Sequence, residues 1–303
     1  MSKNLLNKYV WLVETIYNAK YISYEEINRR WLDDDISEGL EIPKRTFHTW
    51  INEAEELFGL SIQCEHFGDF RYYIEFPEDI KKGGLRNWLL NTISTSNLLM
   101  DNQQLKDRIL LEEVPSVKDH LSPILKAMKA NKMLQITYQS YWREESSTFE
   151  VEPYCVKLFK QRWYLVARSP YYDKVMIYAL DRILSLENLD KAFVMPKKFD
   201  GAAFFADFYG IIAHESAEVE TVKLKVNAGQ ANYLRSLPLH PSQTEVEQSE
   251  EYSIFELHLC PEFDFQQEIL SQTPEIEVLE PQWLRKEIAE KIRVMLEKYQ
   301  TKK

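Results

Sequence analysis

Apolar residues recur at helical spacing in three stretches of the first 60 residues. The stripes are Leu5, Tyr9, Leu12 and Ile16, then Ile27 and Trp31, then Phe47, Ile51, Ala54 and Phe58. Ser23 and Glu26 have the spacing of a capping box that begins the second helix, and Pro43 suits the first turn of the third. Gly59 can end that helix in a left-handed conformation.

Two short strand patterns, 61–65 and 71–75, follow around the turn Gly68-Asp69. Three helices followed by a hairpin are the outline of a winged helix-turn-helix, a fold that binds DNA. The sequence therefore predicts this fold for residues 1–80, and a helical connector for residues 81–120.

Strand patterns replace helical ones from Leu134 onward. Alternating or β-rich runs cover 134–138, 148–154, 163–167 and 175–180. Four or five short strands with brief turns predict a small twisted sheet or barrel within residues 121–200.

The last segment, residues 201–303, begins with a Phe-rich stretch, Phe204 to Ile212, which we interpret as a helical bridge. Strands are then predicted at 218–226, 253–259 and 275–279, and helices at 229–237, 264–271 and 282–299. This order fits a ferredoxin-like α+β sandwich. The whole chain is thus predicted to be a multidomain α+β protein.

Composition narrows the class of protein. The 303 residues are 45% apolar and 13% aromatic, which excludes disorder over most of the chain. No run of about 18 apolar residues exists to span a membrane, and the first residues lack the apolar core of a secretory signal. Cys64, Cys155 and Cys260 lie far apart without a CxxC pair, so a cytoplasmic protein without disulfides or a Cys-rich zinc site is expected.

The net charge of −11 argues against a protein that binds nucleic acid, but the charge is unevenly distributed along the chain. Residues 1–80 carry 8 basic and 16 acidic side chains, and residues 201–303 carry 10 and 18. Residues 121–200 instead carry 13 basic and 9 acidic side chains, a net +4. The central segment can therefore meet an anion, whereas the two ends repel one on average.

Polar residues at the start of the third predicted helix fall opposite its apolar stripe. A recognition helix places base- and phosphate-contacting side chains there. The candidates for contact with a double-stranded DNA operator are Lys44, Arg45, Thr46, His48, Thr49 and Asn52. An ordinary solvated helix face has about equal weight as an interpretation. With so few basic groups, a single copy should bind weakly, so we expect a homodimer that presents two helices to a two-fold site.

Four blocks of the central and basic segment occur in a characteristic order. They are Ile136-Thr-Tyr138, Val151-Glu-Pro-Tyr154, Gln161-Arg-Trp163-Tyr164-Leu165-Val-Ala-Arg168 and Ile177-Tyr178-Ala-Leu-Asp-Arg182-Ile183. In these blocks the sequence resembles the WYL-domain family of transcriptional regulators. The blocks around 234–243, 277–281 and 283–285 are similar to the C-terminal extension of such regulators, so the resemblance covers essentially the whole chain.

The resemblance implies a bacterial transcriptional regulator, typically homodimeric, whose Sm-like β-barrel senses a nucleotide or oligonucleotide. Many such proteins accompany phage-defence or DNA-damage systems. The family pattern implies these ligand-facing residues: Tyr138, Ser140, Tyr154, Tyr164, Arg168, Tyr178 and Arg182. Guanidinium groups pair with phosphates and aromatic rings stack on bases, so the set is chemically consistent.

Structural roles compete with these assignments. Trp163 and Leu165 flank Tyr164 on the strand and are expected in the core. Tyr178 has about even odds of being a packed core tyrosine, and Arg182 has about one chance in three of pairing with a carboxylate. The acidic loop Glu144-Glu145 lies beside the predicted pocket, so the class of ligand stays open.

Enzymatic motifs are absent from the sequence. The six histidines form no HxH or HExxH, and neither GxGxxG nor GxxxxGK[ST] occurs, so no metal, cofactor or catalytic residue is predicted. His240 and Gln243 are expected to fix a turn. The sequence favours a DNA-binding, ligand-responsive repressor. The alternative is a nucleic-acid sensor that acts through a protein partner without operator binding, and a hydrolase is a distant third.

Overall fold

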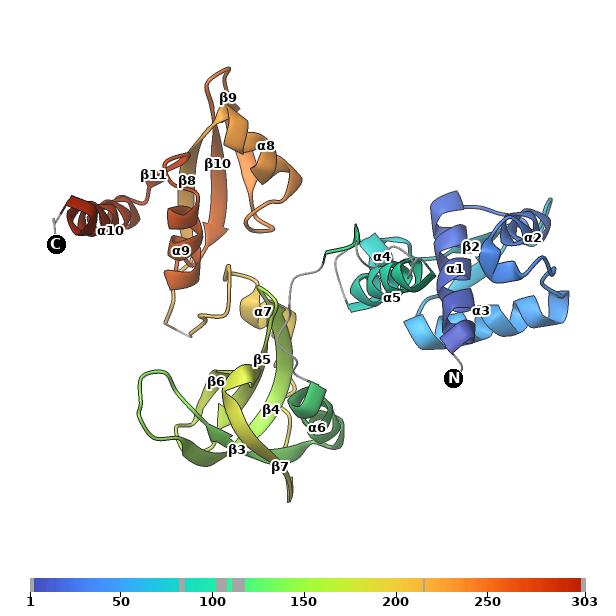
Figure 1. The fold of residues 1–303 in the computed structure, drawn as a ribbon, viewed down its shortest axis with the longest axis horizontal. Helices are drawn as coiled ribbons and strands as arrows, with labels where there is room; N and C mark the ends of the chain where they lie inside the picture. Colours follow the sequence, from blue (N-terminus) through green and yellow to red (C-terminus); the bar gives the residue numbers. More distant parts are fainter. Residues whose placement is uncertain (1–2, 82–84, 102–107, 111–117, 215, 301–303) are drawn as a thin grey trace. The chain divides into compact units, whose positions relative to one another are not determined.

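The computed structural model describes residues 3–81, 85–101, 108–110, 118–214 and 216–300 (Figure 1). The chain divides into two compact units, Met1–Glu112 and Glu113–Lys303. It is a mixed α+β protein with several antiparallel sheets.

The first unit contains three helices followed by a hairpin, in the predicted order. Its elements are α1 (Lys3–Ala19), α2 (Tyr24–Leu32), a 3₁₀ turn η1 (Asp35–Ser37), α3 (Lys44–Phe58), β1 (Ile62–Cys64), β2 (Tyr72–Ile74), α4 (Glu78–Lys81) and α5 (Leu85–Asp101). β1 and β2 pair antiparallel. The core combines the predicted apolar stripes of the three helices with Ile62 and Ile74 of the hairpin, and Ile80 and Leu90 also belong to it. Leu5 is the exception among the predicted stripe residues, because it is 37% exposed.

The predicted helix boundaries of this unit are largely confirmed. Ser23 caps α2 by accepting a hydrogen bond from the Glu26 amide at 3.2 Å. The Glu26 carboxylate, however, binds Arg29 and Arg30. α3 begins one residue after Pro43, which is its N-cap, and Gly59 ends it with φ +61°.

The second unit begins with a helix and a five-stranded antiparallel sheet. These are α6 (Lys118–Ala130), β3 (Lys132–Tyr138), β4 (Ser147–Phe159), β5 (Arg162–Ser169), β6 (Lys174–Ala179), the 3₁₀ turn η3 (Leu180–Arg182) and β7 (Ile183–Ala192). The sheet order is β6-β5-β4-β3-β7. A register shift between Pro153 and Cys155 interrupts the long strand β4, where it pairs with β5. Ile124 and Ala127 of α6 are buried in the core of this sheet.

A second sheet completes this unit. Its elements are α7 (Gly201–Phe205), β8 (Glu220–Asn227), α8 (Ala228–Ser236), β9 (Thr244–Gln248), β10 (Tyr252–Leu259), α9 (Phe263–Ser271), β11 (Ile276–Glu280) and α10 (Gln282–Gln300). From β8 to β11 the order is β-α-β-β-α-β, and the sheet order is β11-β8-β10-β9. β9 was not predicted, and neither was β7.

The predicted helical bridge from Phe204 to Ile212 is wrong for most of its length, because α7 ends at Phe205. Side chains hold the backbone that follows in a non-helical path. The Lys157 ammonium donates to the Gly210 carbonyl at 2.6 Å, and the Asp264 carboxylate accepts from the Ile211 and Ile212 amides at 2.7 and 2.9 Å. Residues 210–212, in the linker between α7 and β8, are therefore hydrogen-bonded to β4 through Lys157 and to α9 through Asp264.

Candidate functional sites

One face of α3 is apolar and buried, and the opposite face is polar and open to solvent. Phe47, Ile51, Ala54 and Phe58 lie in the core. Of the predicted DNA contacts, Lys44, Arg45, His48, Thr49 and Asn52 are exposed, and Thr46 is half-buried. The structure therefore brings these side chains together near the start of one helix.

The approach to α3 is fixed by side chains of α2, which sequence patterns did not reveal. Asn28 accepts from the Ile42 amide at 2.8 Å and donates to the Ile42 carbonyl at 3.4 Å. Tyr24 also donates to that carbonyl, and the Trp31 indole donates to Leu40 at 2.8 Å. These bonds hold the start of α3 in place relative to α2.

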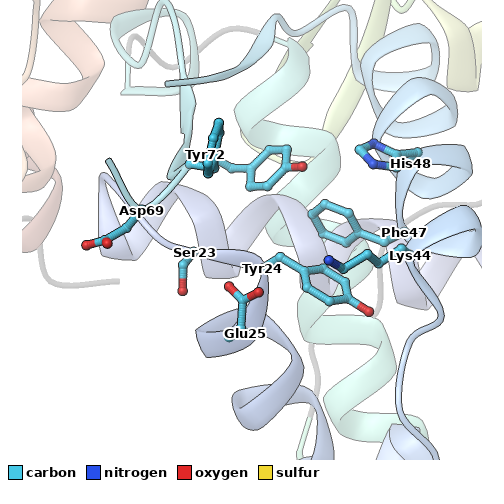
Figure 2. A pocket seen from close by; sticks show the side chains of 9 residues that line it. Ser23, Tyr24, Glu25, Lys44, Phe47, His48, Asp69 and Tyr72 are labelled. Atoms are coloured by element: carbon cyan, nitrogen blue, oxygen red, sulfur yellow. The ribbon is translucent and has the colours of Figure 1, made fainter. Parts of the chain in front are cut away.

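A cavity of about 450 Å³ lies beside this end of α3 (Figure 2). It is lined by Ser23, Tyr24, Glu25, Lys44, Phe47, His48, Asp69, Phe70 and Tyr72, which belong to α2 and its cap, α3 and the hairpin. The Lys44 ammonium lies 5.5 Å from the centre of the Tyr24 ring. Lys44 and His48 thus belong both to the exposed face of α3 and to a cavity that the hairpin helps to form.

Arg182 carries the least compensated positive charge of the predicted ligand residues. Its guanidinium lies 3.8 Å from the centre of the Tyr141 ring, and its Nε is buried without a hydrogen-bond partner. Burial lowers the pKa of Arg182, but the nearby Tyr138 and Tyr141 hydroxyls outweigh burial, and the net shift is upward. Within the described part of the chain, no carboxylate lies within 4.0 Å of this guanidinium.

Tyr138 connects Arg182 to aromatic residues of the sheet core. The Tyr138 and Tyr178 rings meet edge to face with centroids 5.4 Å apart, and Tyr178 also contacts Phe149. Tyr178 is only 7% exposed, and burial raises the pKa of its hydroxyl. Tyr178 is therefore a core residue, whereas Tyr138 is half-buried between the core and Arg182.

Arg168 lies in a different cluster. Its guanidinium binds Glu152 at 3.1 Å and Asp173 at 3.0 Å. Tyr154 is 6% exposed, packs on Phe193, and donates its hydroxyl to Glu152 at 3.3 Å. The carboxylate pairing that was considered for Arg182 is thus found at Arg168.

The two remaining predicted ligand residues are both half-buried. The Ser140 hydroxyl accepts from the Trp142 amide at 3.3 Å, at the start of the loop that carries Tyr141. Burial raises the pKa of Tyr164, which lies within electrostatic range of Arg182. The structure therefore places Tyr138 and Tyr164 within electrostatic range of Arg182. Tyr178 packs on Tyr138, whereas Arg168 and Tyr154 share contacts with Glu152. Tyr141 stacks on Arg182 from an irregular loop, where no periodicity could have identified it.

The core positions expected around Tyr164 differ in burial. Leu165 is fully buried, and Trp163 is half-buried against the same core. His240 and Gln243 do fix a turn, because Gln243 binds Leu239 and Leu234 and His240 binds Ser242 and the Ala206 carbonyl. Among the described residues there is no cluster of potential metal ligands and no helix long and apolar enough to cross a membrane.

Comparisons with known proteins agree with the blocks found in the sequence. The WYL domain profile matches residues 119–188, and the WCX domain profile matches residues 218–296. No curated protein matches the chain.

Two solved structures are similar to most of the chain at low sequence identity. One is proteasome accessory factor B/C (PafBC) of Arthrobacter aurescens, with 16% identity and a TM-score of 0.35 over 94% of this chain. This chain spans only 45% of the length of PafBC. The other is a CRISPR Cas-related protein, with 12% identity and a TM-score of 0.40 over 98% of this chain and 84% of that one. From these two domain matches, the chain contains a WYL domain followed by a WCX domain.

Proposed function

We propose that this protein is a DNA-binding transcriptional regulator, acting as a homodimeric repressor, whose WYL domain senses a nucleotide or oligonucleotide. The proposal assigns operator binding to residues 1–76 and ligand binding to the surface around Arg182. Binding of the ligand changes operator affinity if the two states of the dimer bind the ligand with different affinities.

The arrangement of elements supports three finer fold assignments. The helices and hairpin of the first unit support a winged helix-turn-helix, with α3 as recognition helix. A helix followed by five antiparallel strands, of which β4 is long and interrupted, supports an Sm-like barrel. The β-α-β-β-α-β order supports a ferredoxin-like sandwich for the WCX domain.

The uncompensated guanidinium of Arg182 carries the ligand part of the proposal. A buried N–H without a partner loses hydration and gains nothing in return, so an anionic acceptor there restores a charge-assisted bond. Tyr141 and Tyr138 add aromatic surface on which a base can stack. Arg168 lacks this property because Glu152 and Asp173 already neutralise it.

Calorimetry on the full chain tests this assignment, with mononucleotides, cyclic nucleotides and short oligonucleotides as probes. A charge-assisted bond to phosphate contributes about 1.5–3 kcal/mol, so Arg182→Ala should weaken binding roughly 10- to 150-fold. Arg168→Ala is the matched control and should retain most of the affinity. Equal binding by the wild type and Arg182→Ala excludes this site.

A mobility shift on the DNA upstream of the protein's own gene tests operator binding. Replacing Arg45 and His48 together with alanine should abolish the shift, whereas Arg293→Ala, an exposed arginine on α10, should not. Undiminished binding by the double variant refutes the role of α3. If the wild type binds nucleotides but no DNA, the net negative charge of residues 1–80 prevents operator binding. The alternative, a nucleic-acid sensor that acts through a protein partner, then describes the protein better.

A further inference from the structure

The loop between β1 and β2 exposes two phenylalanines to solvent. We call residues 66–70, His-Phe-Gly-Asp-Phe, the hairpin tip. Phe67 is 89% exposed and Phe70 is 60% exposed. All 15 phenylalanines of the chain are described, and only four are exposed. Two of these four lie within the five residues of the hairpin tip, which indicates an apolar patch rather than scattered apolar side chains.

The base of the hairpin tip is closed by several interactions. The Glu65 amide donates to the Arg71 carbonyl at 2.9 Å, and the two side chains form an ion pair at 2.8 Å. The Cys64 thiol lies 3.3 Å from the Phe70 carbonyl. The two rings are therefore presented on a tied loop and lose little freedom when they bind a partner.

The backbone of the tip adopts conformations that a phenylalanine rarely takes. Phe70 has φ +47°, in the left-handed region that bulky side chains disfavour, and Gly68 has φ +76°. The Phe70 ring gains little burial in return, since most of it is exposed. Backbone strain that the fold does not use is concentrated at functional sites, which points to a contact made outside the isolated chain.

The hairpin tip adjoins the exposed face of α3. Asp69 and Phe70 of the tip line the same cavity as Lys44 and His48 of α3 (Figure 2). A duplex read by α3 in its major groove therefore passes close to the tip. Because the tip and the start of α3 line one cavity, a partner bound to the exposed face of α3 lies beside the tip, and this is the ground for assigning the phenylalanines to the same DNA.

We propose that Phe67 and Phe70 are apolar wedges that enter the minor groove beside the α3 contact and partly unstack a base step. The proposal rests on the DNA binding proposed above. Apolar side chains inserted in this way kink a duplex by about 20–90° toward the major groove. Flexible pyrimidine–purine steps unstack most easily, so TA or CA steps are expected beneath the tip, one on each side of a two-fold operator.

Energy transfer between dyes at the two ends of a duplex measures the bend. The probe is a set of duplexes selected by the full-length protein from a random library. The wild type should bend the selected duplexes by tens of degrees. Replacing both Phe67 and Phe70 with alanine should remove more than half of the bend and weaken binding about three- to tenfold. Phe67→Leu keeps an apolar side chain at this position and should retain part of the bend.

Phe76→Ala is the matched control, because Phe76 is 59% exposed and lies at the opposite end of the hairpin from the tip. It should change neither bend nor affinity. All these side chains are exposed, so the thermal midpoint should stay unchanged in every variant.

The possible outcomes separate the inference from the function on which it rests. A straight complex, or a bend that survives loss of both phenylalanines, overturns the wedge while operator binding stands. If the wild type is a dimer and the same substitutions dissociate it, the tip is a contact between subunits, and the wedge proposal is also overturned. Selection of no duplex at all refutes DNA binding, and the wedge falls with it.

Discussion

Gly210 occupies a position where no side chain fits. A Cβ atom built there lies 2.3 Å from Asp264 Oδ2 and 2.6 Å from Asp264 Cγ, well inside van der Waals contact. The same carboxylate accepts from the amides of Ile211 and Ile212. Gly210→Ala must therefore push Asp264 away and break both hydrogen bonds, although the backbone conformation itself suits alanine.

The cost follows from these two bonds. A hydrogen bond to a charged group contributes about 1.5–3 kcal/mol, and water can replace part of it because the two amides belong to half-buried residues. We therefore expect a loss of about 3 kcal/mol in the free energy of unfolding of the second unit. For a unit of this size, each kcal/mol lowers the midpoint by roughly 2–4 °C, so Tm should fall by roughly 6–12 °C.

Differential scanning calorimetry of the full chain measures this loss, with Gly229→Ala as control. The nearest atom to a Cβ at Gly229 is Asn227 Oδ1 at 3.7 Å, an ordinary contact. Because Gly229 lies in α8, alanine there should leave stability unchanged or raise it by up to about 1 kcal/mol. The reasoning is refuted if Gly210→Ala unfolds within about 1 °C of the wild type, or if both substitutions destabilise equally.

Two further outcomes follow from buried polar groups. Asn28→Ala leaves the Ile42 amide without its side-chain partner and removes one of the two donors to the Ile42 carbonyl, so it should cost about 2 kcal/mol in chemical denaturation of the first unit. The exposed Asn52→Ala should weaken only DNA binding. Burial lowers the pKa of Lys157 from 10.5 to about 8, so between pH 8 and 10.5 this side chain binds more protons in the unfolded chain, and its contribution to stability should rise with pH. Lys157→Met should remove that rise, and identical pH profiles for both proteins would count against the assignment.

Sequence patterns identified the elements that bury one face. Apart from the exposed Leu5, the stripes of α1, α2 and α3 appear as predicted, and so do the cap at Ser23 and the left-handed Gly59, because each depends on neighbours within one or two helical turns. β9 is exposed at every position, and β7 is exposed at most of them. Neither strand alternates between a buried and a solvent face, so the signal that identifies strands was missing.

The linker after α7 shows a different limit. Its apolar composition suits a helix, yet Lys157 from β4 and Asp264 from α9 bind its backbone more than 50 residues away in sequence. Such bonds satisfy the amides and the carbonyl that a helix otherwise satisfies internally. A local pattern carries no information about partners so distant, and the helix prediction failed for that reason.

The candidate ligand site combines both cases. Sequence blocks placed Arg168 and Arg182 in the same set, and nothing in those blocks distinguishes the two guanidinium groups. Strand pairing places Glu152 opposite Arg168, and the turn after β5 adds Asp173. Asp181 is adjacent to Arg182 in sequence, which suggests an ion pair between them, but the Asp181 carboxylate lies 3.4 Å from the Arg162 guanidinium instead. The charge at Arg182 therefore stays available because its sequence neighbour is already engaged, a property that arises from the pairing of strands rather than from any motif.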